Sequence, residues 1–153
     1  MRISDYLSPD FVVGRLTARD ADGVLREVSD RAAAAGIGQA DLIHARLLER
    51  ERQQSTVLGP GLAIPHATVA GLAKPVIGIA LAEEPVGFGP PEVEAVSVFL
   101  VLLSPPGHER AHIKLLARIC RLGRDKTFIP TLIAAEGDQA IVDALGTLDA
   151  HYS

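Results

Sequence analysis

Three side chains in this sequence are of the types needed for nucleophilic and anion-binding chemistry: His66, His112 and Arg50. His66 ends the apolar stretch "GPGLAIPH", where a predicted short strand runs out into a loop. A neutral imidazole has a lone pair near pH 7 and can act as a nucleophile. The planar fork of an arginine matches the oxygens of a phosphate. Two histidines and one arginine, without a metal cage or a nucleotide-binding loop, favour a phosphohistidine site.

Other ionisable residues offer alternatives to this interpretation. His108 and Glu109 flank the start of a predicted helix, where a capping or solvated-loop role is favoured. Glu109 also lies one turn from His112 and could orient that ring. A metal site built from His66, His108 and His112 is disfavoured, because no carboxylate stands at ligand spacing. Cys120 lies on the inner side of the same helix, which is typical of a small buried hydrophobic residue.

The composition limits the class of protein. The chain has 153 residues, of which 48% are hydrophobic and 22% charged, so we expect one domain, 1–153, with its own core. Its net charge is −4 and its bases are interspersed with acids, which argues against a nucleic-acid partner. The longest apolar run, "AVSVFLVLLSPP", is too short to span a bilayer, and the N-terminus lacks a secretory pattern. These features predict a cytoplasmic protein.

Cofactor motifs are missing from the sequence. GxGxxG, GxxxxGK[ST], HExxH and GxSxG do not occur, so no tightly bound cofactor and no metal is expected. The single cysteine excludes an internal disulfide. Any chemistry must therefore come from individual side chains.

The elements that must position these side chains follow from hydrophobic periodicity. Along the chain, predicted helices are followed by strands and then by further helices. This order predicts an α/β fold with a sheet covered by helices on both faces. The order and direction of the strands stay open. Strands are expected at 11–16, 75–86 and 96–106, and helices at 20–36, 39–52, within 104–123, at 129–135 and at 138–148. Asp138 is the predicted cap of the last helix, and Pro130 makes the preceding helix irregular.

Helical spacing places two of the three candidate site residues at the ends of predicted helices. Arg50 continues the inner stripe of Ile43 and Leu47, with Arg52 as the alternative if the register is shifted. His112 opens the inward stripe of its helix, where the N-terminus would lower the pKa of the ring and supply N–H groups suited to an anion.

Longer stretches of sequence carry a family resemblance. "LLERERQQSTVLGPGLAIPHA" followed by "HIKLLARI" resembles the enzyme IIA domain of the fructose and mannitol type in the bacterial phosphotransferase system, a family that includes the nitrogen-regulatory IIA proteins. The resemblance extends from "ISDYLSPDFV" through the last helix. It implies a three-layer α/β/α sandwich with a mixed central sheet.

The resemblance also implies roles. His66 would accept a phosphoryl group from the phosphocarrier protein HPr or its nitrogen-branch relative. It would then pass the group to a cysteine of a IIB domain, or the modified protein would regulate others. His112 would be the partner histidine and Arg50 the phosphate contact, while Ser55 and Thr56 would either line the site or only form the turn. The protein would be at most peripheral to a membrane permease.

Three positions beside the site depart from the family pattern. Gln54 and Ala67 stand where glycine is frequent, and Pro60 stands where a polar residue is common. We expect such changes to affect partner choice or loop flexibility and to leave the three proposed site residues unaltered.

Overall fold

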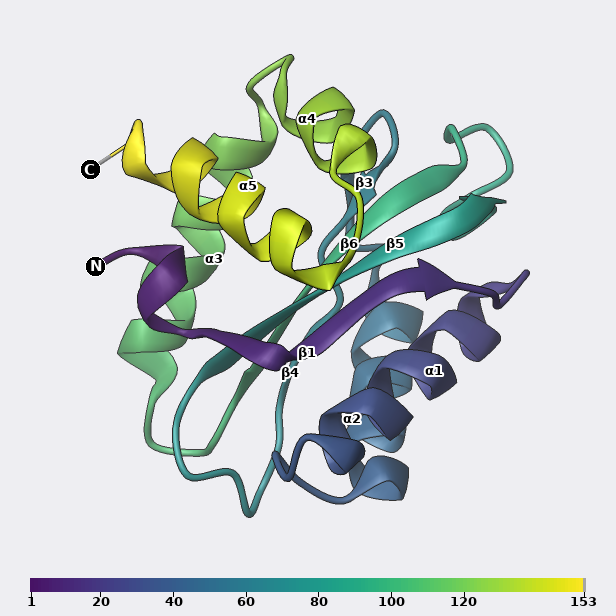
Figure 1. The fold of residues 1–153 in the computed structure, drawn as a ribbon. Helices are drawn as coiled ribbons and strands as arrows, with labels where there is room; N and C mark the ends of the chain where they lie inside the picture. Colours follow the sequence, from purple (N-terminus) through teal and green to yellow (C-terminus); the bar gives the residue numbers. More distant parts are fainter. Residues whose placement is uncertain (153) are drawn as a thin grey trace.

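The computed structural model describes residues 1–152 and confirms the predicted fold class: a mixed β-sheet lies between two layers of helices (Figure 1). Helices α1 and α2 cover one face of the sheet, and α3, α4 and α5 cover the other (Figure 1). The helices are α1 (Ala21–Ala34), α2 (Ala40–Gln53), α3 (Glu109–Gly123), α4 (Phe128–Ala134) and α5 (Asp138–Ala150), preceded by a short 3-10 helix, η1 (Ile3–Asp5).

The sheet has six strands, whose order the sequence left open. They are β1 (Leu7–Leu16), β2 (Val57–Gly59), β3 (Leu62–Ala63), β4 (His66–Thr68), β5 (Val76–Val86) and β6 (Val96–Ser104). The order is β1-β5-β6-β3-β2, and β4 also pairs with β6. β5 is parallel to β1 and antiparallel to β6, whereas β3 and β4 both run parallel to β6.

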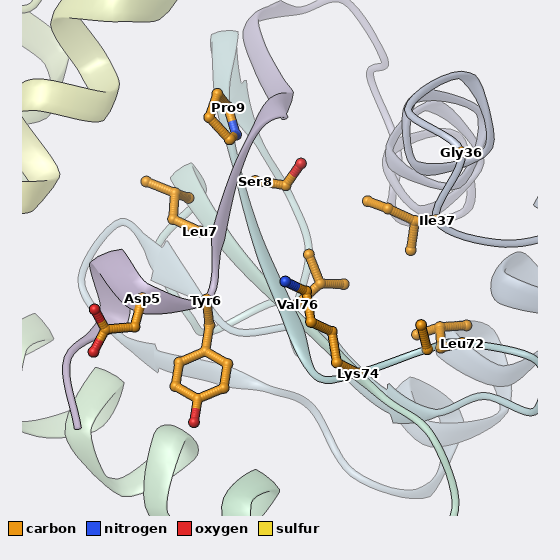
Figure 2. A pocket seen from close by; sticks show the side chains of 11 residues that line it. Asp5, Tyr6, Leu7, Ser8, Pro9, Gly36, Ile37, Leu72, Lys74 and Val76 are labelled. Carbon is orange, nitrogen blue, oxygen red and sulfur yellow. The ribbon is translucent and has the colours of Figure 1, made fainter.

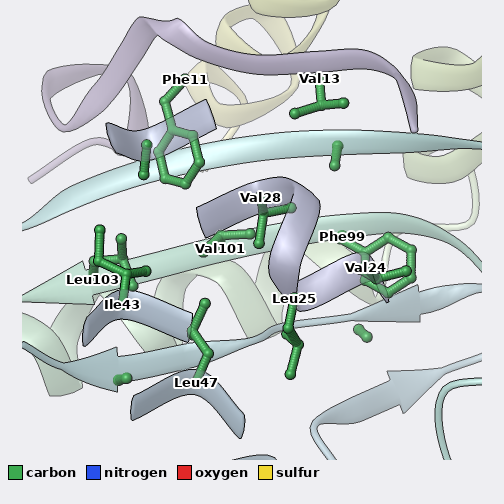
Figure 3. Close-up of a cluster of buried hydrophobic side chains, with 14 of the residues drawn as sticks. Phe11, Val13, Val24, Leu25, Val28, Ile43, Leu47, Phe99, Val101 and Leu103 are labelled. Carbon is green, nitrogen blue, oxygen red and sulfur yellow. The ribbon is translucent and has the colours of Figure 1, made fainter. Parts of the chain in front are cut away.

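The two long apolar runs form the central strands because both of their faces are buried. Along β6, Phe99, Val101 and Leu103 face the layer of α1 and α2, where they meet side chains such as Leu25 and Ile43 (Figure 3). The alternate residues of β6 pack against α3, α4 and α5 instead. This alternation is the period of two expected of a strand.

The structure corrects the prediction for the segment around His66. The strand does not run out into a loop at this residue: β3 breaks at Ile64 and Pro65, and β4 resumes at His66 beside the same strand, β6. Pro65 has no N–H to donate, but its carbonyl accepts a hydrogen bond from Leu102 N at 3.0 Å. The chain between β3 and β4 therefore stays bonded to β6. Gly61, with a φ of 80°, makes the tight turn between β2 and β3.

Other boundaries also differ from the expectation. β1 begins at Leu7, since an edge strand tolerates Pro9. The cap of α5 is Gly137, and Asp138 is the first helical residue. Pro130 lies in the first turn of α4, where its missing N–H costs no helical bond, so this helix is regular.

A buried ion pair fixes α3, the helix that carries His112, against the C-terminal helix. Arg118 Nε donates to Asp149 Oδ1 at 2.6 Å, and Nη2 donates to the Asp149 carbonyl at 2.9 Å. The same carboxylate accepts from Ser4 N at 3.4 Å. One charged cluster therefore joins both ends of the described chain to α3. No helix within residues 1–152 is long and apolar enough to cross a membrane.

Gly78 in β5 gives a test of this packing. A Cβ at Gly78 would lie 2.4 Å from Cδ2 of the Phe11 ring. Gly78→Ala should therefore lower the free energy of unfolding by about 1–3 kcal/mol, measured by urea denaturation. Gly146→Ala is the control: nothing lies within 4 Å of its Cβ, and alanine favours the helix. Equal stability of the two variants would contradict the close contact.

Candidate functional site

A shallow cavity of about 380 Å³ brings together the three side chains singled out in the sequence, Arg50, His66 and His112. It lies where β4 and β6 end, because His66 is paired with Leu102, two residues before the last residue of β6. Arg50 reaches it from α2 and His112 from α3, two helices on opposite faces of the sheet (Figure 1). The remaining lining residues are Arg46, Glu49, Gln53, Ala67 and Thr68.

The backbone determines which nitrogen of His66 carries the proton. Its Nδ1 lies 2.7 Å from the carbonyl oxygen of Ile64. A carbonyl only accepts, so Nδ1 must be the protonated nitrogen, and the lone pair of the neutral ring is on Nε2. The break at Ile64 and Pro65 thus presents a histidine with one defined nucleophilic atom.

His112 is oriented by a residue that the sequence analysis missed. Its Nδ1 lies 2.8 Å from Oγ of Ser104, the last residue of β6. The signal was present in the sequence, since Ser104 is the first polar residue after the run "VFLVLL". Glu109 accepts a hydrogen bond from Gly107 N at 3.0 Å at the start of α3, as in the cap role favoured from the sequence, and does not bond to His112. The centroids of the His66 and His112 rings are 5.7 Å apart.

Burial favours the neutral form of both rings. It is the main cause of the lowered pKa of His66; the hydrogen bond to the Ile64 carbonyl acts in the opposite direction, and the positive charge of Arg50 adds to the lowering. Burial also lowers the pKa of His112, followed by the effect of His66, while Glu109 acts in the opposite direction. The predicted direction for His112 is right, but its predicted cause is not the leading one. His112 N donates to the His108 carbonyl at 3.0 Å and is not a free donor of the helix end.

Arg50 is held at the end of α2 by a hydrogen bond to the backbone just beyond the helix. Its Nη1 donates to the Gln54 carbonyl at 2.8 Å. A guanidinium has five N–H donors, so most remain for an anion in the cavity. Arg52, the alternative by register, is exposed and lies outside the lining.

Ser55 and Thr56 are not among the residues that line the cavity. Thr56 is buried, and its N and Oγ1 both donate to the carboxylate of Glu51 at 2.7 Å. Ser55 Oγ accepts from Val57 N at 3.2 Å. Burial raises the pKa of Glu51, and the two bonds from Thr56 oppose this effect. Of the two roles left open for the hydroxyls, these contacts favour the turn-forming one.

Two other features of residues 1–152 differ from this cavity in their chemical groups. In residues 1–152, no three His, Cys, Asp or Glu side chains gather as they would around a metal ion. A second hollow of about 320 Å³ lies between the start of β1 and the loop that leads into β5 (Figure 2). It is lined by residues such as Tyr6, Ile37 and Lys74, and no histidine is among its described lining residues. Cys120 is half-buried, and burial raises the pKa of its thiol.

The three-layer fold and the pair of half-buried histidines characterise this protein, and comparison with known families identifies its class. Residues 5–147 match the model of the family "Phosphoenolpyruvate-dependent sugar phosphotransferase system, EIIA 2". The chain belongs to this family, as the resemblance in the sequence implied.

This chain is similar both to nitrogen regulatory proteins and to components of fructose-specific phosphotransferase systems. A nitrogen regulatory protein from Bradyrhizobium diazoefficiens is 32% identical over 146 residues, which are 95% of each chain. The fructose-specific EIIABC component of Bacillus subtilis is 26% identical over 97% of this chain, which spans only 24% of that longer protein.

Solved structures share the fold. The nitrogen regulatory protein IIA-Ntr from Neisseria meningitidis superposes with a TM-score of 0.85 at 24% identity, covering 94% of this chain and 98% of the other. The enzyme IIA of the mannitol system from Escherichia coli, solved in complex with its phosphorylated IIB, superposes with a TM-score of 0.76 at 17% identity, covering 92% and 96% of the two chains.

The two half-buried histidines of the cavity predict how the stability of the protein changes with pH. The unfolded chain takes up protons at these rings as the pH falls through 6.5, whereas the folded chain resists because both pKa values are lowered. The free energy of unfolding should therefore fall between about pH 7.5 and about pH 5.5. This fall should be smaller in the double variant His66→Gln/His112→Gln. His108→Gln, which changes an exposed histidine outside the cavity, should keep the original fall. An unchanged pH dependence in the double variant would contradict this assignment.

Proposed function

We propose that the protein is a phosphocarrier that accepts a phosphoryl group on Nε2 of His66 from an HPr-type phosphohistidine protein and passes it to a cysteine of a IIB domain. The observation that carries the proposal is the hydrogen bond from His66 Nδ1 to the Ile64 carbonyl, because it leaves Nε2 as the nucleophile in a cavity shared with Arg50 and His112. Membership of the enzyme IIA family supports it.

The first transfer is an in-line displacement at phosphorus. The lone pair on His66 Nε2 forms the new P–N bond, while the P–N bond of the donor breaks and its electron pair returns to the donor imidazole. Positive charge that develops on the His66 ring is stabilised through Nδ1–H and the Ile64 carbonyl. The guanidinium of Arg50 neutralises the equatorial oxygens, so the step needs positioning and charge, not a general base.

The second transfer reverses these roles. A cysteine thiolate of the IIB partner attacks the phosphorus, the new P–S bond forms, and the electron pair of the broken P–N bond returns to Nε2. We infer that His112 binds the phosphoryl oxygens during this step, and its ring centroid, 5.7 Å from that of His66, supports this role. Burial lowers the pKa of His112 and favours the neutral ring, which donates a hydrogen bond from Nε2–H when Nδ1 accepts from Ser104.

A regulatory role is the second candidate, and one comparison favours it. The relative with 32% identity over 95% of both chains is named a nitrogen regulatory protein. In this role the same phosphorylation of His66 would control binding to a target protein. A phosphorylated protein that keeps its label when mixed with a phosphorylatable IIB domain would support regulation over sugar transport.

Phosphorylation at His66 can be tested directly. Incubation with labelled phosphoenolpyruvate, the first enzyme of the system and HPr, or its nitrogen-branch relative, should place one acid-labile phosphate on the wild-type protein. His66→Ala should abolish labelling because no other ring in the cavity has a free nucleophilic nitrogen fixed by the backbone. His108→Ala, an exposed histidine outside the cavity, is the matched control and should label normally. Normal labelling of His66→Ala would refute the proposed acceptor.

His112→Ala separates acceptance from onward transfer. The variant retains the nucleophile and should still become labelled. Its transfer to a IIB cysteine should slow by about a hundredfold, since a positioned donor to the phosphoryl oxygens is lost. Single-turnover loss of label after mixing with IIB measures this rate. Unchanged onward transfer would show that His112 has no role in the step.

A further inference from the structure

Two arginines of α2 line the cavity that contains His66. Arg46 and Arg50 are four residues apart, so they lie one turn from each other on the same side of the helix. Arg50 faces the phosphoryl oxygens in the proposed transfer, whereas Arg46 has no part in it. Like charges at this spacing repel each other, so the two arginines are unfavourable neighbours as long as no anion lies between them.

Glu49 compensates the charge of Arg46 in the unphosphorylated protein. Arg46 Nη1 donates to Glu49 Oε2 at 2.8 Å, and both residues line the cavity. The two side chains are 46% and 62% exposed and come from positions i and i+3 of one helix. An exposed ion pair of this kind contributes little to stability and opens readily. The guanidinium of Arg46 can therefore turn from Glu49 to another acceptor in the cavity.

Phosphorylation of His66 would bring more negative charge into this cavity than Arg50 can neutralise. A phosphoryl group on a side chain carries a charge of about −1.5 to −2 at pH 7 and has three acceptor oxygens. Arg50 supplies a single positive charge, and its Nη1 is already bonded to the Gln54 carbonyl. The cavity also includes Gln53, the last residue of α2, and the C-terminal end of a helix carries partial negative charge. A second cation would therefore stabilise the phosphorylated state.

We propose that Arg46 is a second phosphate-binding residue of the site, which leaves Glu49 and donates to the phosphoryl oxygens when His66 is phosphorylated. The inference rests on the phosphocarrier function proposed above and adds to it a residue that stabilises the phosphorylated state. Glu49 has the opposite effect, because its carboxylate competes for the guanidinium and repels the phosphoryl oxygens. Arg46 and Glu49 together then set how strongly this protein holds the phosphoryl group relative to its donor and its acceptor.

The test measures the equilibrium constant for phosphoryl transfer from an HPr-type carrier to this protein, using the labelled fraction of each protein once exchange is complete. Arg46→Gln should lower this constant by about fivefold, since the phosphorylated state loses a charge-assisted hydrogen bond. Glu49→Gln should raise the constant by a similar factor. A role confined to folding would not give opposite shifts, because both variants remove the same ion pair from the unphosphorylated protein.

The pKa of the phosphoryl group on His66 gives a second readout. A nearby cation favours the dianion and lowers this pKa, so removal of the cation should raise it. The phosphorus NMR signal of phosphorylated Arg46→Gln should therefore titrate at a higher pH than that of the wild type. The signal of phosphorylated Glu49→Gln should titrate at a lower pH, because a neighbouring negative charge is lost.

The matched controls are Arg52→Gln and Glu136→Gln, which make the same changes of charge at exposed positions outside the cavity lining. Both should keep the wild-type equilibrium constant and the wild-type pKa of the phosphoryl group. Thermal unfolding should show all four variants folded, since each changes an exposed side chain. Equal shifts in Arg46→Gln and Arg52→Gln would overturn the proposal, because the effect would then follow net charge alone.

Failure of the Arg46 proposal and failure of the phosphocarrier function are distinguishable. A labelled wild type with an unchanged equilibrium constant in Arg46→Gln overturns the role of Arg46 and leaves the phosphocarrier function intact. A wild-type protein that takes no label from the carrier refutes the phosphocarrier function, and the role of Arg46 falls with it. Slower transfer to Arg46→Gln with an unchanged equilibrium constant would assign Arg46 to the encounter with the donor and overturn its role as a phosphate-binding residue.

Discussion

The hydrogen bond between His66 Nδ1 and the Ile64 carbonyl is the interaction on which the site depends. It exists because the strand path beside β6 breaks at Ile64 and Pro65, which turns the Ile64 carbonyl away from the ladder and toward the ring of the residue two positions later. Pro65 keeps the path attached through its own carbonyl. A continuous strand would have used the Ile64 carbonyl in the sheet and left the tautomer of His66 undefined.

The electrostatic state of the cavity follows from burial more than from neighbouring charges. Desolvation is the largest cause of the lowered pKa of both His66 and His112. A neutral pair can lie 5.7 Å apart without repulsion, and each neutral ring can both donate and accept a hydrogen bond. The positive charge of the site then comes from Arg50, which is always charged and can face an incoming phosphate.

The three-layer arrangement is what makes this cavity possible. Arg50 and His112 come from helices on opposite faces of the sheet, and they meet only because α2 ends and α3 begins at the edge where β4 and β6 end. The ion pair of Arg118 with Asp149 holds α3 in that position from its buried side. One helix therefore contributes both to the core and to the site.

The sequence by itself determined the fold class, the central strands β5 and β6 and the residue types of the site, because apolar periodicity and the "PH" and "HxxLL" stretches are local patterns. It also placed Arg50 and His112 at helix ends facing inward. Only the tertiary structure decided that these residues share one cavity, that Ser104 and not Glu109 orients His112, and that Thr56 is bonded to Glu51 outside the lining. Those contacts join segments whose relative placement depends on strand order, and strand order is set by packing between distant parts of the chain, which no local pattern encodes.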